Sequence, residues 1–287
     1  MEKLVTPIDS HTILYGVFGD PIRHSRSPIM LNRAFEEAGI NAVYAAFHVR
    51  PEELGDAVRG IRALGYRGVN VTIPHKVEVM QYLDEIDEGA RIVGAVNTIV
   101  NESGKLIGYN TDGIGYVRSL KEETGIDLKK KSVLLLGAGG AARGVAYALA
   151  KEGIRRIYIA NRTKERALEL ADTISTYTEA IGLGMDELGP VVDEVQFVLN
   201  TTSAGMHPHV EEVPLPLELL RSHHLVSDLI YNPRITRFLR EAEARGARIH
   251  GGLGMFIYQG AFAFEYWTGT PAPVAAMRQV VEQSLAE

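Results

Sequence analysis

The stretch "KKKSVLLLGAGGAARG", residues 129–144, constrains the fold more than any other part of the chain. A run of charged and polar residues gives way to a continuous apolar run, which is typical of a strand buried on both faces of a parallel sheet. Glycines and a helical stretch follow, and Gly137, Gly139 and Ala142 match the pattern G-x-G-x-x-A. Small residues at these places permit a tight turn, close approach of the backbone to a pyrophosphate, and close helix–strand packing. The stretch therefore predicts a dinucleotide-binding domain.

Strand-like and helix-like segments alternate along the rest of the chain, as in parallel sheets covered by helices on both faces. Apolar runs such as "AVYAAFHV" at 42–49 alternate with amphipathic spans such as "PEELGDAVRGIRALG" at 51–65. We therefore expect an α/β fold with two doubly wound domains and a cleft between them. The first domain takes residues 1–112 and is completed by 252–287, and the second takes 113–251.

Composition and charge exclude several classes of function. The 287 residues carry a formal net charge of −6, whereas binding to nucleic acids or anionic membranes normally needs a basic excess. No cysteine is present, which excludes disulfides, thiolate metal ligands and cysteine nucleophiles. The N-terminal segment has no signal-peptide core, and no apolar run approaches the ~20 residues of a membrane helix. We expect a cytoplasmic protein without a nucleic-acid or membrane partner.

The end of the next apolar strand indicates which dinucleotide is bound. NAD sites usually carry an acidic residue about 20 residues after the glycines, whereas NADP sites place an arginine nearby. This chain reads "IYIANRTKERALEL" at 157–170, with Asn161, Arg162 and Thr163 at the strand end. Lys164 and Arg166 follow, and the only acidic candidate lies inside the start of the next helix. Cations are disfavoured at a helix start, and a bound 2′-phosphate would remove that penalty. The pattern favours NADP.

A second stretch, "GVNVTIPHKVEV" at 68–79, reads as a strand whose end carries polar side chains. Apolar and polar residues alternate over five positions, and Pro74 then ends the strand because it has no N–H to donate. Asn70, Thr72 and Lys76 are left near this strand end. Taken alone, Lys76 reads as a surface lysine.

Several blocks of residues together resemble the shikimate dehydrogenase family. The blocks are "SRSP" (25–28), "NVTIPHK" (70–76), "GAVNT" (94–98), "NTDG" (110–113), "GAGGAA" (137–142), "NRT" (161–163), "NTTSAGM" (200–206), "DLIYNP" (228–233) and "GLGMFIYQGA" (252–261). They follow the family's order over nearly the whole chain. The resemblance implies reversible, NADPH-dependent reduction of 3-dehydroshikimate to shikimate, a step of chorismate and aromatic amino acid biosynthesis. It also implies an N-terminal substrate-binding domain and a Rossmann-type NADP domain.

The resemblance implies that Lys76 and Asp112 form the catalytic pair. Hydride transfer to a ketone creates an alkoxide, which needs a nearby proton donor or cation, and lysine can supply both. An adjacent carboxylate would orient the lysine. The resting charge of Lys76 stays open, because desolvation lowers the pKa of a lysine and a neighbouring carboxylate raises it. Asp112 also fits a helix N-cap.

The resemblance assigns the remaining site residues. The substrate-binding residues that it implies are Ser25, Ser27, Asn70, Thr72, Asn97, Tyr231 and Gln259. The cofactor-binding residues that it implies are Glu88, Gly137, Ala138, Gly139, Gly140, Ala141, Asn161, Arg162, Thr163, Lys164, Arg166, Asn200, Thr202, Ser203, Leu229 and Gly252.

Structural roles compete with these assignments. Ser27 is the expected N-cap of a helix with Pro28 at its first position. Asn70 and Asn97 could form turns, and the polar residues at 200–203 could form an Asx or ST turn. Gln259 could lie on an exposed helix face.

Two other functions remain open. One is a quinate/shikimate dehydrogenase that uses NAD, and the other is a protein that senses NADP without catalysis. Serines at both 25 and 27, with Arg162, favour the strict shikimate enzyme, and the catalytic pair argues against a sensor. We expect no metal, because the histidines at 207–209 and 223–224 lack the spacing of helical ligands. A homodimer is possible.

Overall fold

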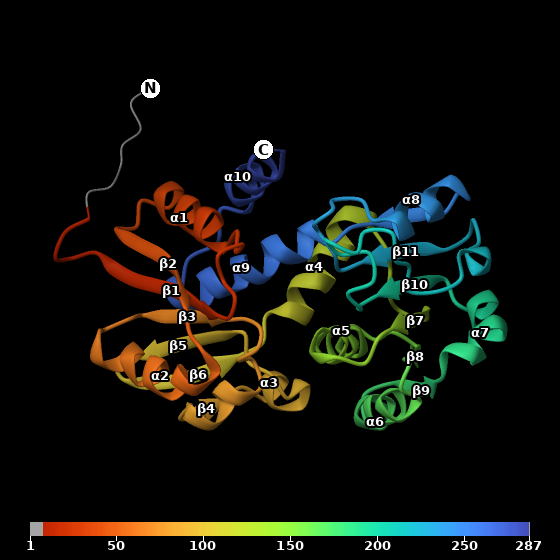
Figure 1. The fold of residues 1–287 in the computed structure, drawn as a ribbon, viewed down its shortest axis with the longest axis horizontal. Helices are drawn as coiled ribbons and strands as arrows, with labels where there is room; N and C mark the ends of the chain where they lie inside the picture. The colour runs from red at the N-terminus through yellow and green to blue at the C-terminus, as the bar shows by residue number, and fades with distance from the viewer. Residues whose placement is uncertain (1–7, 287) are drawn as a thin grey trace. The chain divides into compact units, whose positions relative to one another are not determined.

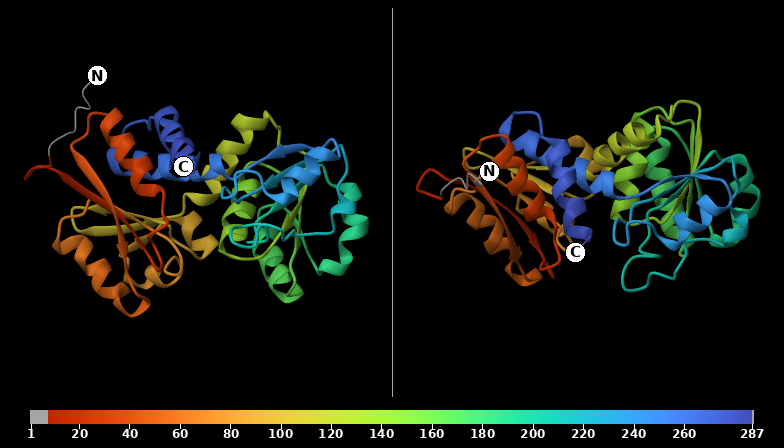
Figure 2. Two further views of the ribbon diagram at one scale, coloured as in Figure 1. Left: turned by 45° about the horizontal axis from the view of Figure 1, so that its top comes forward. Right: turned by 90° about the horizontal axis from the view of Figure 1, so that it is seen from above.

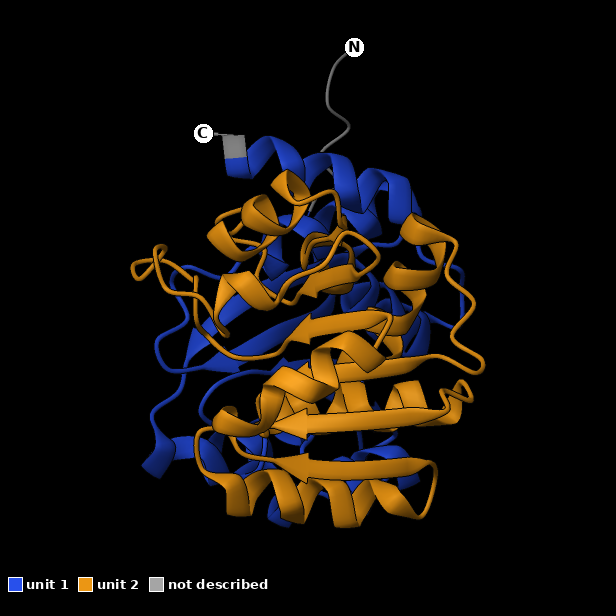
Figure 3. Ribbon diagram, turned by 90° about the vertical axis from the view of Figure 1, so that its right-hand side faces the viewer, with its two compact units in different colours: residues 1–111, 257–287 blue, residues 112–256 orange. Residues whose placement is uncertain are grey.

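The computed structural model describes residues 8–286. The chain divides into two compact units, which Figure 3 shows in two colours. Unit 1 is Met1–Thr111 with Ile257–Glu287, and unit 2 is Asp112–Phe256. The second crossing between the units falls inside one continuous helix, α9 (Leu253–Thr268). The sequence pattern placed the crossings at 112/113 and 251/252, and the compact units divide at 111/112 and 256/257.

Unit 1 contains a six-stranded sheet in the order β2-β1-β3-β5-β6-β4. The sheet is mixed, because β5 pairs antiparallel with both β3 and β6 while the other pairs are parallel. Its elements are β1 (Ile13–Gly19), α1 (Ser27–Glu37), β2 (Ala42–His48), the 3-10 helix η1 (Pro51–Glu53), α2 (Leu54–Ala63), β3 (Gly68–Val71), the 3-10 helix η2 (Glu78–Tyr82), β4 (Glu85–Ile86), α3 (Glu88–Val93), β5 (Thr98–Glu102), β6 (Lys105–Tyr109) and α10 (Val274–Ala286).

Both faces of this sheet are covered. Figures 1 and 2 show α1, α10 and the C-terminal part of α9 on one face and α2 on the other. On the α9 face, Trp267 packs against Tyr15 and donates its indole N–H to the carbonyl of Ile99 at 3.0 Å. Gly68 makes this close packing possible, because a Cβ there would lie 2.1 Å from the indole nitrogen. Helix α9 therefore contributes Trp267 to the core of unit 1.

Unit 2 contains a six-stranded, fully parallel sheet in the order β12-β11-β10-β7-β8-β9. Numbered from β7, this is the 3-2-1-4-5-6 order of dinucleotide-binding folds, and the strand order reverses between β7 and β10. Its elements are α4 (Asp112–Thr124), β7 (Ser132–Leu136), α5 (Gly140–Lys151), β8 (Arg156–Ala160), α6 (Lys164–Ser175), β9 (Glu179–Leu183), η3 (Met185–Glu187), α7 (Leu188–Glu194), β10 (Phe197–Asn200), η4 (Leu217–Leu219), β11 (Leu225–Asp228), α8 (Arg237–Ala244) and β12 (Arg248–His250). The expected α/β fold is confirmed.

Two local expectations were wrong. The strand predicted through residue 73 ends at Val71, all four of its residues are buried, and Ile73 is 73% exposed. The alternation is therefore not that of a half-buried strand. The N-cap of α1 is Arg26 rather than Ser27, because the Ser25 hydroxyl accepts the Ser27 N–H and the helix begins at Ser27 itself.

No helix among the residues that the structure describes is long and apolar enough to cross a membrane.

Candidate active site

The polar residues singled out in unit 1 lie at one edge of its sheet. Strands β1, β3 and β6 run in the same direction, so their carboxyl ends share an edge. Ser25 and Ser27 follow β1, Lys76 follows β3, and Thr111, the last residue of unit 1 before Asp112, follows β6. Asn97 stands directly before the antiparallel β5 and therefore lies at the same edge. Ligands of open α/β sheets bind outside the carboxyl ends of the strands.

Asn70 and Asn97 are joined in a buried hydrogen-bond network. The amide of Asn70 donates to the carbonyl of Asn97 at 3.1 Å and to the hydroxyl of Thr98 at 3.0 Å. The side-chain oxygen of Asn97 accepts the N–H of Thr111 at 2.9 Å. Asn70 is 7% exposed and Asn97 2%. Asn70 lies inside β3, so the turn expected for it as an alternative role is not formed.

The loop that carries Lys76 is fixed by its neighbours on both sides. The Lys76 carbonyl accepts the N–H of Val96 at 2.8 Å, and the His75 N–H donates to the carbonyl of Thr72. The His75 ring is 1% exposed, and its Nε2 lies 2.7 Å from the carbonyl oxygen of Val49. Lys76 itself is half-buried. This anchoring holds the lysine backbone in one place beside the strand end.

Asp112 and Gln259 are placed by one buried threonine. The Thr111 hydroxyl donates to the carbonyl of Gln259, in α9, at 3.0 Å, and also bonds the side chain of Asn97. Asp112, the next residue, begins α4 and is half-buried, as is Gln259. Lys76 belongs to unit 1, and Asp112 is the first residue of unit 2.

In unit 2, the glycine-rich turn after β7 has the geometry of a phosphate site. Gly137 has φ +110°, and a Cβ there would lie 2.7 Å from the Thr201 hydroxyl. A Cβ on Gly139 or Gly140 would meet nothing within 4 Å. In the described chain no side chain caps the start of α5, and its first turn holds no acidic residue. Its first N–H groups are therefore available to an anion.

The end of β8 presents two exposed arginines. Across residues 8–286, no hydrogen bond or ion pair joins the side chain of Arg162 or Arg166 to another residue. Lys164 differs, because it forms a 2.7 Å ion pair with Glu187, which raises the pKa of Lys164. The two guanidinium groups are thus the cations at this strand end that a 2′-phosphate could engage. The residues of this turn and of the β7–α5 turn fit NADP.

The side chain of Asn200, at the end of β10, forms its hydrogen bonds with groups of the protein itself. Its oxygen accepts the N–H and hydroxyl of Thr202, and its amide donates to Ala204 and to Asp228. Asn200 therefore forms the turn expected as its alternative role, and it shapes the loop that exposes Ser203. Asp228, which the sequence patterns did not single out, is fully buried and also accepts the Ile230 N–H.

Close packing and ring stacking place the last residues of the predicted set. A Cβ on Gly252 would lie 2.1 Å from the carbonyl oxygen of Leu229, so only glycine allows this approach. The ring of Tyr231 stacks on Phe256 with 4.7 Å between centroids, within unit 2. Glu88 begins α3 in unit 1 and is exposed.

Four buried residues that were not among the predicted site residues support the polar groups at the carboxyl edge of unit 1: Tyr44, His75, Thr98 and Thr111. His75, Thr98 and Thr111 stand inside the blocks that carry the family resemblance, where they could have been noticed. Tyr44 is an aromatic residue in an apolar strand, and nothing in the sequence distinguishes it from an ordinary core residue.

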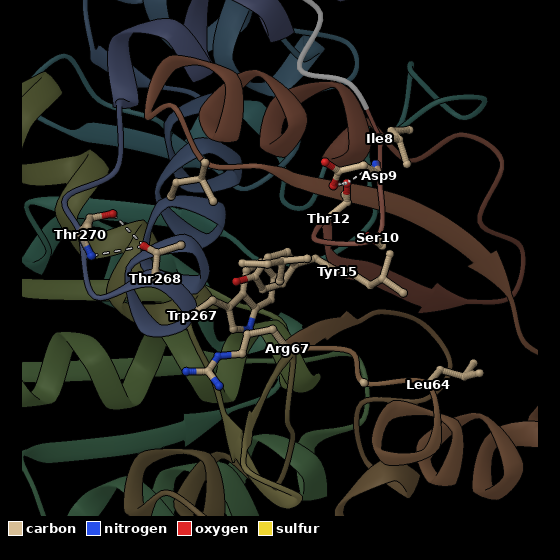
Figure 4. A pocket seen from close by; sticks show the side chains of 14 residues that line it. Ile8, Asp9, Ser10, Thr12, Tyr15, Leu64, Arg67, Trp267, Thr268 and Thr270 are labelled. Atoms are coloured by element: carbon tan, nitrogen blue, oxygen red, sulfur yellow. Dashed lines mark hydrogen bonds between the residues drawn. The ribbon is translucent and has the colours of Figure 1, made fainter.

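A pocket of about 950 Å³ lies at the opposite edge of the unit 1 sheet. It surrounds the start of β1 and the residues before β3, and Figure 4 shows its lining side chains, Tyr15, Arg67 and Trp267 among them. None of the predicted site residues lines it. The hollow is therefore separate from the carboxyl-edge site. No group of three or more His, Asp or Glu within the described residues is placed to hold a metal ion.

Three family models match successive parts of the chain. Residues 17–99 match the shikimate dehydrogenase substrate binding domain, 119–215 match shikimate/quinate 5-dehydrogenase, and 252–282 match the shikimate 5'-dehydrogenase C-terminal domain. These matches assign the substrate-binding part to unit 1.

Individual relatives agree over nearly the full length. A protein of Geobacillus sp. (strain WCH70), named shikimate dehydrogenase (NADP(+)), is 52% identical and covers 95% of this chain and 98% of its own length. A crystal structure of a shikimate dehydrogenase in complex with NADP+ is 46% identical, with a TM-score of 0.91 and 98% of both chains covered. The Listeria monocytogenes enzyme, solved with shikimate and NAD, is 40% identical, with a TM-score of 0.92 over 97% of this chain and 99% of its own. Because these similarities extend over almost every residue, the chain belongs to the shikimate dehydrogenase family.

Proposed function

We propose that this protein is an NADP-dependent shikimate dehydrogenase, which interconverts 3-dehydroshikimate and shikimate in chorismate and aromatic amino acid biosynthesis. Family membership over nearly the whole chain, at about half identity to an enzyme of that name, is the observation that carries the proposal. The side chains at the carboxyl edges of the two sheets also support the proposal.

The cofactor assignment is supported by the turns after β7 and β8. The Gly137 turn and the uncapped start of α5 suit a pyrophosphate, and the exposed Arg162 and Arg166 suit a 2′-phosphate. An NAD enzyme would instead need an acceptor for the ribose hydroxyls at the β8 end. The first acidic residue after this strand in the sequence, Glu165, lies in the first turn of α6.

The substrate assignment is supported by the short polar side chains at the carboxyl edge of unit 1. A polyhydroxylated ring acid needs several donors and acceptors around fixed points. Ser25 and Ser27 supply hydroxyls at the start of α1, where a carboxylate is favoured. Asn70, Thr72 and Asn97 supply further polar groups on a rigid network.

We assign the proton transfer to Lys76 and its orientation to Asp112. The bound NADPH supplies the hydride. As the carbonyl carbon of the substrate gains the hydride, its oxygen takes a proton from the Lys76 ammonium group, so the product is a neutral alcohol. The anchored backbone of Lys76 fixes the base of this side chain, which reduces the freedom lost when it engages the substrate. In the reverse direction the neutral amine accepts the hydroxyl proton.

One assay tests this proposal and its rivals. The purified protein is given shikimate or quinate with NADP or NAD, and the absorbance of the reduced nicotinamide is followed. We expect far higher kcat/KM for shikimate with NADP than for any other pair. Equal rates with quinate, or a preference for NAD, would favour the quinate/shikimate class, which the name of the matched 119–215 model includes. Binding of NADP without turnover of either acid would favour a sensor.

A further inference from the structure

Tyr44 stands at the centre of the buried network of unit 1, although it lies on the edge strand β2. It is 2% exposed, and its hydroxyl donates to the side-chain oxygen of Asn70 at 2.8 Å. Strand β1 separates β2 from β3, so the tyrosine side chain reaches across β1 to do so. Its backbone is held as well, because Asn32 of α1 bonds both the N–H and the carbonyl of Tyr44. The phenol therefore has one well-defined position.

The hydrogen bonds of the Asn70 side chain determine whether it can donate or accept a further hydrogen bond with a ligand. Its two N–H hydrogens are used by the carbonyl of Asn97 and the hydroxyl of Thr98. Its oxygen accepts from Tyr44 and keeps a second lone pair. In this orientation Asn70 can accept a hydrogen bond from a substrate hydroxyl but cannot donate one.

Burial raises the pKa of Tyr44 well above its usual value. The phenol therefore keeps its proton at neutral pH and remains the donor in its hydrogen bond with the Asn70 oxygen.

We propose that Tyr44 is a positioning residue of the substrate site, which holds Asn70 as an acceptor for a ring hydroxyl. This inference rests on the proposed function, because it takes the bound molecule to be a hydroxylated ring acid. Removing the phenol oxygen leaves the Asn70 oxygen without its donor. Substrate binding is then weakened, while the dinucleotide turns, which belong to unit 2, are unchanged.

The test is Tyr44→Phe, with Tyr116→Phe as its matched control. Tyr116 is also fully buried, and its hydroxyl donates to Ser227 at 2.9 Å in unit 2. Each variant loses one buried hydroxyl and keeps its ring. We expect Tyr44→Phe to raise the Kd and KM for shikimate about 10-fold, the scale of one hydrogen bond, with kcat and the KM for NADP within about 2-fold. Tyr116→Phe should leave the Kd for shikimate unchanged.

A double variant separates positioning from a general loss of stability. If Tyr44 acts through Asn70, Tyr44→Phe combined with Asn70→Ala should bind shikimate about as weakly as Asn70→Ala alone. Additive losses in that cycle, or an unchanged Kd for shikimate in Tyr44→Phe, would overturn the inference while the proposed function stands. Failure of the wild-type protein to bind and oxidise shikimate would overturn both.

Discussion

The buried carboxyl group of Asp228 makes the stability of the protein depend on pH in a predictable direction. Burial raises the pKa of Asp228 from its ordinary 3.8 to about 6, although hydrogen bonds from Ile230, Thr236 and Asn200 partly oppose the shift. The folded state therefore binds a proton that the unfolded state releases between about pH 4 and pH 6. The contribution of Asp228 to the free energy of unfolding is largest below this window and falls as pH rises through it. A shift of about 2 units corresponds to roughly 3 kcal/mol.

Asp228→Asn removes this pH dependence without removing the contacts. One carboxyl oxygen accepts the N–H of Ile230 and the amide of Asn200, both at 3.1 Å, and an asparagine oxygen can do the same. The other oxygen accepts the Thr236 hydroxyl at 2.7 Å, and an asparagine amide can donate to that hydroxyl instead. Reversing the direction of this one hydrogen bond lowers the free energy of unfolding of the variant by an amount that does not depend on pH. The readout is therefore how the difference between variant and wild type changes with pH.

Urea unfolding of both proteins at pH 5, 6 and 7.5 measures that difference. Relative to wild type, Asp228→Asn should gain about 1–1.5 kcal/mol between pH 5 and pH 7.5, roughly half of the full effect. Other titrating groups contribute equally to both proteins and cancel. A difference that stays constant over this range would refute the reasoning, because Asp228 would then be ionised equally easily in the folded and unfolded states.

Three further variants, two of them paired with a control variant, test the sites and the packing. Lys76→Ala should lower turnover of shikimate by ~10²–10⁴-fold in steady-state kinetics, the scale of a general acid, and near-normal turnover would remove Lys76 from the mechanism. Arg162→Asp should weaken binding of NADPH much more than binding of NADH in titrations. The control is Arg155→Asp, at an exposed position at the other end of β8, which should change the binding of neither cofactor. An unaltered cofactor preference in Arg162→Asp would contradict the assignment of NADP. Gly113→Ala should lower the thermal midpoint of unfolding, because the added Cβ would lie 2.1 Å from the Gly144 carbonyl oxygen. In the control Gly60→Ala the added Cβ meets nothing closer than 4.0 Å, so the free energy of unfolding should rise by about 0.5–1 kcal/mol. Equal effects of the two glycine variants would show that the Gly113 contact does not limit packing.

Sequence patterns succeeded where the information is local. The apolar run before Gly137, the positive-φ glycine and the helix behind it are consecutive residues, so their order alone predicts a strand, a turn and a helix. The pattern failed at residues 69–73 because β3 is buried on both faces, where polar Asn70 is satisfied by partners that periodicity cannot identify. Ser27 was misassigned as a cap because Ser25, two residues earlier, can accept the same kind of hydrogen bond.

The sequence by itself therefore determined the α/β class, the dinucleotide turn with its neighbouring arginines, and the residues of the family blocks, since each depends on spacing along the chain. Only the tertiary structure decided how these residues are held. Tyr44 and Asn70 are 26 residues apart and meet because β1 is inserted between their strands in one register. Asn200 and Asp228 meet because β10 and β11 are adjacent. Such pairs depend on strand order and burial. A polar side chain is held in one position only when folding excludes water and leaves particular protein groups as its hydrogen-bond partners.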